Sequence, residues 1–175
     1  MNDVLETIKT RRSIRKFRPD MVPQEILDRI IEAGTYAATG KNRQSPIILQ
    51  VTNREVRDRI SRLNCAIGGW EAGFDPFYGA PAILIVLARK DSPHRVYDGS
   101  LVMGNLMLAA HALGVGSCWI HRAREEFETE EGTALLRSLG IAEEYEGIGH
   151  CALGYADGEY PAAPPRKENW VYSIQ

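Results

Sequence analysis

Residues 82–121 read AILIVLARKDSPHRVYDGSLVMGNLMLAAHALGVGSCWIH, and this stretch decides the class of fold. The continuous apolar run over 82–88 predicts a strand that is buried on both faces. Residues 95–113 are apolar on nearly every side of a helix, and Gly114 follows as a C-cap. Residues 115–121 then predict a second, shorter strand. A buried strand, a long helix and another strand indicate helices layered on a sheet.

The flanking sequence continues this alternation of strands and helices. The spacing of apolar residues predicts further helices over 23–37, 54–63 and 130–139, and further strands over 47–52 and 147–153. Three prolines follow Tyr160, so the tail is expected to be extended. Neither a repeat nor a linker divides the chain, and 175 residues fit one α/β or α+β domain.

Composition excludes several classes of protein. The net charge of −2 argues against non-specific nucleic-acid binding, which requires a basic surface. No run of about 18 apolar residues appears, so we expect no membrane span, and the first residues do not resemble a signal peptide. The three cysteines are odd in number and far apart, which indicates reduced thiols and a cytoplasmic location.

Common catalytic and nucleotide-binding motifs are either absent from the sequence or lie between the wrong predicted elements. Gly114 and Gly116 follow a helix and precede a strand, whereas a Rossmann glycine motif needs the reverse order. The chain has no phosphate-binding Gly-Lys-Ser/Thr loop and no Gly-x-Ser-x-Gly nucleophile elbow. The four histidines lack metal-ligand spacing, so no metal site is predicted. His121 is set apart because it ends a strand, beside Arg122 and Arg124.

Residues 11–18, RRSIRKFR, concentrate positive charge in an otherwise slightly acidic chain. Arg11, Arg12 and Arg15 surround the hydroxyl of Ser13, and guanidinium groups bind phosphate through a planar fork. The segment follows a short amphipathic stretch. Basic residues also favour helix C-termini, so a solvated helix end is the alternative to an anion site.

A loop over 38–44, ATGKNRQ, is the second candidate element. Its small residues permit close approach of the backbone to a ligand, and Asn42 and Gln44 each offer a donor and an acceptor. That combination suits the edge of a flat heteroaromatic ring. A polar surface loop that joins a helix to a strand explains the same residues.

Two apolar segments leave alternatives open. The helix over 95–113 needs cover that a second subunit would supply, or it is the central helix of a monomer. The glycines and aromatic residues of 68–81, among them Trp70, Phe74 and Phe77, form either the mouth of a substrate site or a loop that packs on itself.

Taken in order, four motifs resemble the nitroreductase family of FMN-dependent oxidoreductases. They are Arg-Arg-Ser-Ile-Arg at 11–15, Asn-x-Gln at 42–44, Gly-Ala-Pro at 79–81 and Gly-Val-Gly-Ser-Cys-Trp-Ile at 114–120. The resemblance continues to Leu153-Gly154-Tyr155 and the proline-rich tail. The chain departs from many members at Ala38-Thr39 and at His121.

The resemblance implies an α+β, three-layer fold with a central mixed sheet flanked by helices. It also implies a homodimer with two FMN sites at the subunit interface, the tail (about 156–175) extending towards the partner. The expected flavin-binding residues fall in four groups along the chain: Arg11, Arg12, Ser13 and Arg15; Ala38, Thr39, Gly40, Asn42 and Gln44, reaching the partner's flavin; Trp119, Ile120, His121 and Arg122, beside the ring; and Arg166 with Lys167, at the phosphate.

The activity implied is reduction of nitro compounds, quinones or similar electron-poor acceptors by NADH or NADPH through FMN, with no catalytic side chain. A ping-pong order is expected, in which reductant and acceptor use the site in turn. Other flavin chemistry within the family, such as dehydrogenation or dehalogenation, is an alternative. A non-catalytic flavin-binding or sensor protein is another, and a dimer without a ligand is a third.

Overall fold

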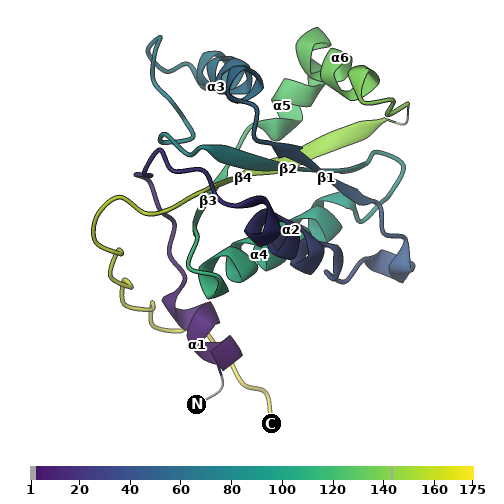
Figure 1. Ribbon diagram of the computed structural model, residues 1–175. Coiled ribbons are helices and arrows are strands. Elements are labelled where there is room, and N and C mark those ends of the chain that lie inside the picture. The colour runs from purple at the N-terminus through teal and green to yellow at the C-terminus, as the bar shows by residue number, and fades with distance from the viewer. Residues whose placement is uncertain (1–2, 143) are drawn as a thin grey trace.

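A computed structural model, which describes residues 3–142 and 144–175, shows a sheet between two layers of helices (Figure 1). The α+β class and the three layers are therefore confirmed. Helices α3, α5 and α6 cover one face of the sheet, α2 and α4 cover the other, and α1 lies beyond the sheet. The helices are α1 (Asp3–Thr10), α2 (Gln24–Thr35), η1 (Gly40–Asn42), α3 (Arg54–Gly68), α4 (Arg95–Ala112), α5 (Ala123–Glu128) and α6 (Glu130–Ser138).

The sheet has the strand order β1-β2-β4-β3, and every neighbouring pair in it is antiparallel. The prediction of a mixed sheet is wrong for these four strands, and the reason lies in β4. Strands β2 and β3 run in the same direction around the α4 crossover, but β4 inserts between them and pairs with both. The strands are β1 (Pro46–Val51), β2 (Ala82–Arg89), β3 (Gly116–Ile120) and β4 (Tyr145–Gly154).

Alternate residues of the central strand β2 enter two separate cores. Ile83, Ile85 and Leu87 pack against the α3, α5 and α6 layer, whereas Leu84 and Val86 face α2 and α4. All residues of β2 up to Ala88 are buried, as the apolar run predicts. Removal of this apolar surface from water is the main stabilising contribution to the fold.

The long helix α4 is buried on one side only. Val102, Met103 and Leu106 lie against the sheet, whereas Val96 and Leu101 are exposed. Close contact with the sheet requires a glycine, since a Cβ at Gly99 would lie 2.5 Å from the Ile148 side chain. Apolar side chains therefore remain exposed on the other side of α4, and cover by a second subunit stays a prediction.

Other boundaries differ in ways that have local causes. Helix α3 continues to Gly68, past the expected end at residue 63, because Asn64 and Cys65 are buried and Gly69 supplies the left-handed cap. Helix α5 was not expected from the sequence. It follows β3 directly after Arg122, which adopts a left-handed φ of 79°.

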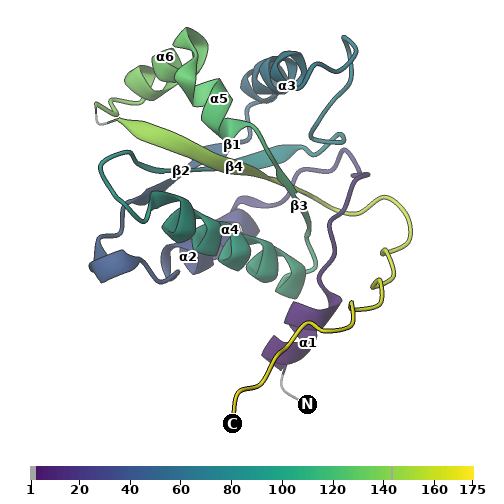
Figure 2. The same ribbon diagram turned by 180° about the vertical axis from the view of Figure 1, so that it is seen from behind.

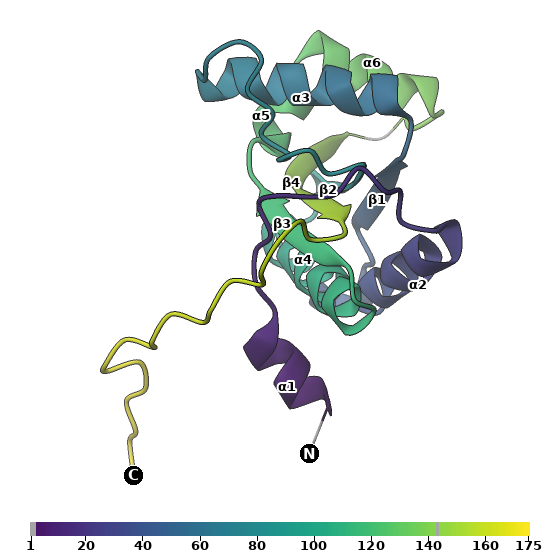
Figure 3. The same cartoon turned by 60° about the vertical axis from the view of Figure 1, so that its left-hand side comes forward.

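Both ends of the chain meet beside β3 and β4. Ser13 forms a parallel bridge with Ser117 of β3, and Phe17 pairs with Ala156 just after β4. The tail then extends away from the sheet without a helix or strand. It overlaps α1 in the view of Figure 2, whereas Figure 3 shows that the two run separately. In the part of the chain that the structure describes, no helix has the length and apolar character needed to cross a bilayer.

Candidate functional site

The basic segment lines a cavity of about 800 Å³ between the end of α1 and the tail. Its lining includes five of the expected flavin-binding residues: Arg11, Arg12, Ser13, Arg15 and Arg166. Pro161 and Pro164 belong to its wall. The structure thus brings together the two groups of basic residues that come from opposite ends of the sequence. Lys167 does not line the cavity and instead lies over the Trp170 ring, 5.1 Å from its centroid.

Guanidinium nitrogens in this cavity are buried without a partner. Arg11 Nη1 and Arg12 Nε have no hydrogen-bond acceptor among the described residues. Arg12 Nη1, by contrast, donates to the backbone carbonyls of Lys9 and Arg11 at 2.7 and 2.6 Å. An unsatisfied buried donor is costly, and an anion in the cavity would accept from both. The chemistry of this donor set therefore fits a phosphate group.

The segment is held in place by backbone pairing to β3. Ile14 N donates to Ser117 O at 2.9 Å, and the Ile14 side chain is buried against Gly116. The pairing is parallel, so the direction from Arg11 to Arg15 follows the direction of β3 towards Ile120. Arg11 and Arg12 therefore lie beside the later part of the tail, whereas Phe17, at the other end of the segment, pairs with Ala156 where the tail begins.

His111 of α4 connects α1 to the tail beside this cavity. Its Nε2 lies 2.9 Å from Thr10 Oγ1, and its Nδ1 lies 2.9 Å from Tyr160 Oη. Thr10 Oγ1 already donates to the carbonyl of Glu6, so His111 donates through Nε2 and accepts from Tyr160. Burial, together with the charges of Arg11 and Arg12, lowers the pKa of His111. A neutral imidazole therefore holds the tail against the cavity.

The loop over 38–44 lies apart from this cavity in the same chain. The segment that contains η1 is at the opposite end of the α2 and α4 layer from α1 (Figures 1 and 2). Thr39 and Gln44 line a separate cavity of about 400 Å³, and Ala38 is exposed beside them. Gly40 N donates to the buried carboxylate of Asp98 at 2.9 Å.

The backbone of this loop is strained. Lys41, Asn42 and Gln44 all have positive φ angles, of 55°, 52° and 48°. Residues other than glycine adopt this conformation rarely, and such strain gathers at functional sites. The side chains of Asn42 and Gln44 are exposed and bond to each other at 3.2 Å. At Gly40 the close approach is to the His94 ring, since a Cβ there would lie 2.4 Å from it.

The end of β3 presents a sharp turn. Trp119 is half-buried, and its indole lies directly over Gly149, where a Cβ would come within 2.2 Å of Nε1. Ile120 is buried, whereas the His121 side chain is exposed. Arg122 lies 5.7 Å from the Trp70 ring centroid and pairs with Glu125 at 3.8 Å.

The loop between α3 and β2 packs partly on its own aromatic rings. The ring centroids of Trp70 and Phe74 are 5.4 Å apart, and those of Phe74 and Tyr78 are 6.3 Å apart. Phe77 differs, because it is completely buried in the core. A cavity of about 560 Å³ lies between α3 and this loop. The loop therefore packs on itself, as one of the two alternatives predicts. Its other predicted role, as the mouth of a substrate site, stays a prediction.

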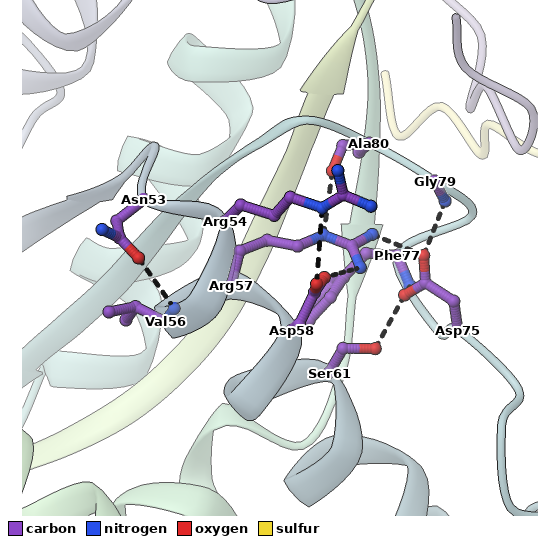
Figure 4. Close-up of polar contacts among 10 residues, drawn as sticks. All are labelled: Asn53, Arg54, Val56, Arg57, Asp58, Ser61, Asp75, Phe77, Gly79 and Ala80. Atoms are coloured by element: carbon purple, nitrogen blue, oxygen red, sulfur yellow. Dashed lines mark hydrogen bonds and ion pairs between the residues drawn. The ribbon is translucent and has the colours of Figure 1, made fainter. Parts of the chain in front are cut away.

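Figure 4 shows what fixes this loop. Asp75 accepts hydrogen bonds from the Arg57 guanidinium, from Ser61 Oγ at 2.8 Å and from Gly79 N at 2.7 Å. Burial alone would raise the pKa of Asp75, but these hydrogen bonds hold the pKa below its ordinary value. Arg57 Nε also donates to the carbonyl of Ala80 at 3.0 Å, which ties the loop to the start of β2.

Sequence patterns did not identify two buried polar clusters. One is this Arg57–Asp75 pair. The other joins Asn64, Glu126 and His150, which come from α3, α5 and β4. Asn64 lies beyond the helix end that the periodicity predicts, and His150 falls inside an apolar strand. Only the fold brings these positions together.

Burial keeps two of the three thiols protonated. Cys65, Cys118 and Cys151 are free and buried. Burial raises the pKa of Cys118 despite the nearby charges of Arg15 and Arg11, and burial likewise raises the pKa of Cys151. Both thiols therefore stay protonated at neutral pH.

Comparisons with known proteins agree with this arrangement. A sequence model described as the nitroreductase family matches residues 8–66 and 69–155. A protein of Methanothermobacter thermautotrophicus, named a putative NADH dehydrogenase/NAD(P)H nitroreductase, is 34% identical over 126 residues, covering 67% of this chain and 60% of its own length. A protein of the same name from Archaeoglobus fulgidus is 29% identical, covering 91% of this chain and 88% of its own length. The match therefore spans less than two thirds of the first of these relatives.

A solved structure shares the whole fold. The nitroreductase of Bacteroides fragilis, crystallised with bound FMN, superposes with a TM-score of 0.89 at 30% identity. The superposition covers 100% of both chains.

Proposed function

The chain belongs to the nitroreductase family, and we propose that it binds FMN and uses NADH or NADPH to reduce an electron-poor acceptor such as a nitro compound or a quinone. The observation that carries this proposal is the cavity lined by Arg11, Arg12, Arg15 and Arg166. Its buried, unpartnered guanidinium nitrogens suit the phosphate of the cofactor that the Bacteroides fragilis structure contains.

The parallel pairing of the basic segment with β3 supports an orientation for the cofactor. We assign the phosphate to the end of the cavity with Arg11, Arg12 and Arg166, and the polyol chain to the side of Ser13. The ring then belongs near Arg15 and the end of β3. From Ser117 to His121 the strand and its continuation extend by about 13 Å, which leaves room for the polyol chain and the ring.

The rest of the proposed site would come from a second copy of the chain. Ala38, Thr39, Gly40, Asn42 and Gln44 would contact the flavin from the partner subunit, since they lie far from the basic cavity of their own chain. Large apolar side chains are exposed on α1, on α4 and in the tail, and a homodimer would cover them. They are Val4, Leu5, Ile8, Val96, Tyr97, Leu101, Trp170, Val171, Tyr172 and Ile174.

The protein's own residues have binding and orienting roles in this proposal. Bound flavin supplies the hydride chemistry, so no side chain needs to act as a nucleophile or a metal ligand. Arg15 is the cation expected to stabilise negative charge on the reduced ring. Trp119, Ile120, His121 and Arg122 would form the wall beside the ring. Lys167, which lies over Trp170 outside the cavity, would reach the phosphate only if the tail rearranged. Reductant and acceptor would occupy one place in turn, in ping-pong order.

The free thiols support a reducing compartment, and we assign the protein to the cytoplasm. The physiological acceptor is expected to be a small molecule. Nucleic acid is not an expected partner, given the net charge of −2.

The absorption spectrum of the purified protein tests the proposal. We expect a yellow protein whose flavin absorbance is bleached by NADH or NADPH without oxygen and restored by a nitroaromatic compound or a quinone. A protein that binds FMN but shows neither change would be a flavin-binding sensor. A colourless protein that takes up no added FMN would refute the proposal.

A further inference from the structure

Three completely buried polar side chains form a connected network under α3 and α5. Asn64 and His150 have no exposed surface, and Glu126 is 1% exposed. Asn64 Nδ2 donates to Glu126 Oε1, and His150 Nε2 lies 2.7 Å from Glu126 Oε2. The Phe77 ring packs against the network, with its centroid 5.2 Å from the centroid of the His150 ring. Burial of a carboxyl group is costly unless hydrogen-bonding partners compensate for it, and here Asn64 and His150 lie at its two oxygens.

Both ends of the network lie at the backbone where β3 ends. Asn64 Nδ2 also donates to the carbonyl of His121 at 2.9 Å, and His150 Nδ1 lies 3.4 Å from the carbonyl of Ile120. The last ladder pair joins Ile120 to His150, so the His121 carbonyl lies beyond the sheet. Both partners of the Asn64 amide are acceptors, which fixes its NH₂ group towards them.

This contact orients the peptide between His121 and Arg122. The peptide is trans and planar, so its carbonyl and its N–H point in opposite directions. Because the carbonyl faces Asn64 in the interior, the Arg122 N–H faces away from the core. Helix α5 begins in close contact with β4, because a Cβ at Gly147 would come within 2.1 Å of Ala123 O. Arg122, between the end of β3 and this contact, has a left-handed φ of 79°.

We infer that Asn64, Glu126 and His150 are positioning residues for the flavin site. They hold the peptide between His121 and Arg122 so that its N–H faces the ring side of the site. None of the three touches the cofactor. The inference rests on the proposed function, which assigns the ring to the end of β3.

Amide hydrogen exchange on the full-length chain without added flavin tests the orientation itself. Asn64→Ala is expected to raise exchange in residues 121–123 by roughly tenfold or more, because the segment opens locally without its anchor. Asn53→Ala is the matched control, since it removes the same type of side chain from the other end of α3, where Asn53 accepts from Val56 N as the N-cap. Asn53→Ala should lower the melting temperature while exchange in 121–123 stays as in the wild type.

The second measurement uses the protein with FMN bound. Asn64→Ala should lower kcat roughly tenfold, with nearly unchanged KM for the acceptor and a shifted flavin reduction potential. Asn53→Ala should leave all three unchanged. Glu126→Gln keeps the size of the side chain but replaces one of its two acceptor oxygens by an NH₂ group, and it provides the same test if Asn64→Ala does not fold. Wild-type exchange and wild-type kcat in the folded variant would overturn the inference. A wild-type protein without flavin binding would instead refute the proposed function, whatever the exchange shows.

Discussion

Replacement of Arg11 by alanine should weaken binding of FMN through the phosphate. Arg11 Nη1 is buried in the basic cavity and has no acceptor among the described residues, so it is available to an anion. A hydrogen bond to a charged group contributes about 1.5–3 kcal/mol, and each ~1.4 kcal/mol is tenfold in affinity. The dissociation constant for FMN should therefore rise roughly 10- to 100-fold, and Arg11→Lys should recover part of the loss.

The assay is a titration of apoprotein with FMN, followed by quenching of flavin fluorescence. Lys16→Ala is the matched control, because Lys16 lies in the same basic segment but pairs with Asp157 at 2.7 Å and does not line the cavity. It removes the same charge and should leave the affinity nearly unchanged.

Riboflavin, which lacks the phosphate, separates the two ends of the cofactor. Its affinity should be the same for the wild type and for Arg11→Ala. If Arg11→Ala binds FMN as tightly as the wild type, or if riboflavin loses as much affinity as FMN, then Arg11 does not bind the phosphate. An equal loss in Lys16→Ala would point to the general field of the segment rather than to the cavity.

Three further predictions concern the dimer and the pH dependence. Chains carrying Arg11→Ala and chains carrying Asn42→Ala, mixed into one dimer, should regain one site with wild-type FMN affinity; a titration that finds only weak sites would exclude sharing between subunits. Asp75→Asn should lower the free energy of unfolding at pH 7 by about 2 kcal/mol in urea denaturation. Because the pKa of Asp75 is lowered on folding, its contribution to the free energy of unfolding is present above pH 4 and lost below it. The difference in that free energy between wild type and Asp75→Asn should therefore shrink on acidification, and a constant difference would contradict this. The pKa of His111 is likewise lowered, so the wild type should lose stability as the pH falls below about 6.5, and His111→Gln should remove part of that slope; identical slopes would exclude His111.

Local patterns in the sequence were enough to predict most of the layered fold. The apolar run of β2, the C-cap at Gly114 and the spacing of apolar residues in α2 are local signals, and they gave these elements to within a few residues. The antiparallel sheet was not predicted, because insertion of β4 between β2 and β3 is a choice between distant pairings that no local pattern encodes.

The candidate site divides in the same way. Arg11, Ser13 and Arg15 are adjacent in sequence, so their shared cavity could be expected from the basic run alone. The network of Asn64, Glu126 and His150 could not, because each residue has an ordinary setting in its own segment and gains its partners only by tertiary packing.

The pairing of Ser13 with Ser117, and the presence of Arg166 opposite Arg11, affect the order of events during biosynthesis. Residue 166 must leave the ribosome before this cavity can close around Arg11. If the cavity holds the phosphate of FMN as proposed, the coenzyme binds only after that point of synthesis, and a nascent polypeptide that stalls before residue 166 would have an incomplete cavity.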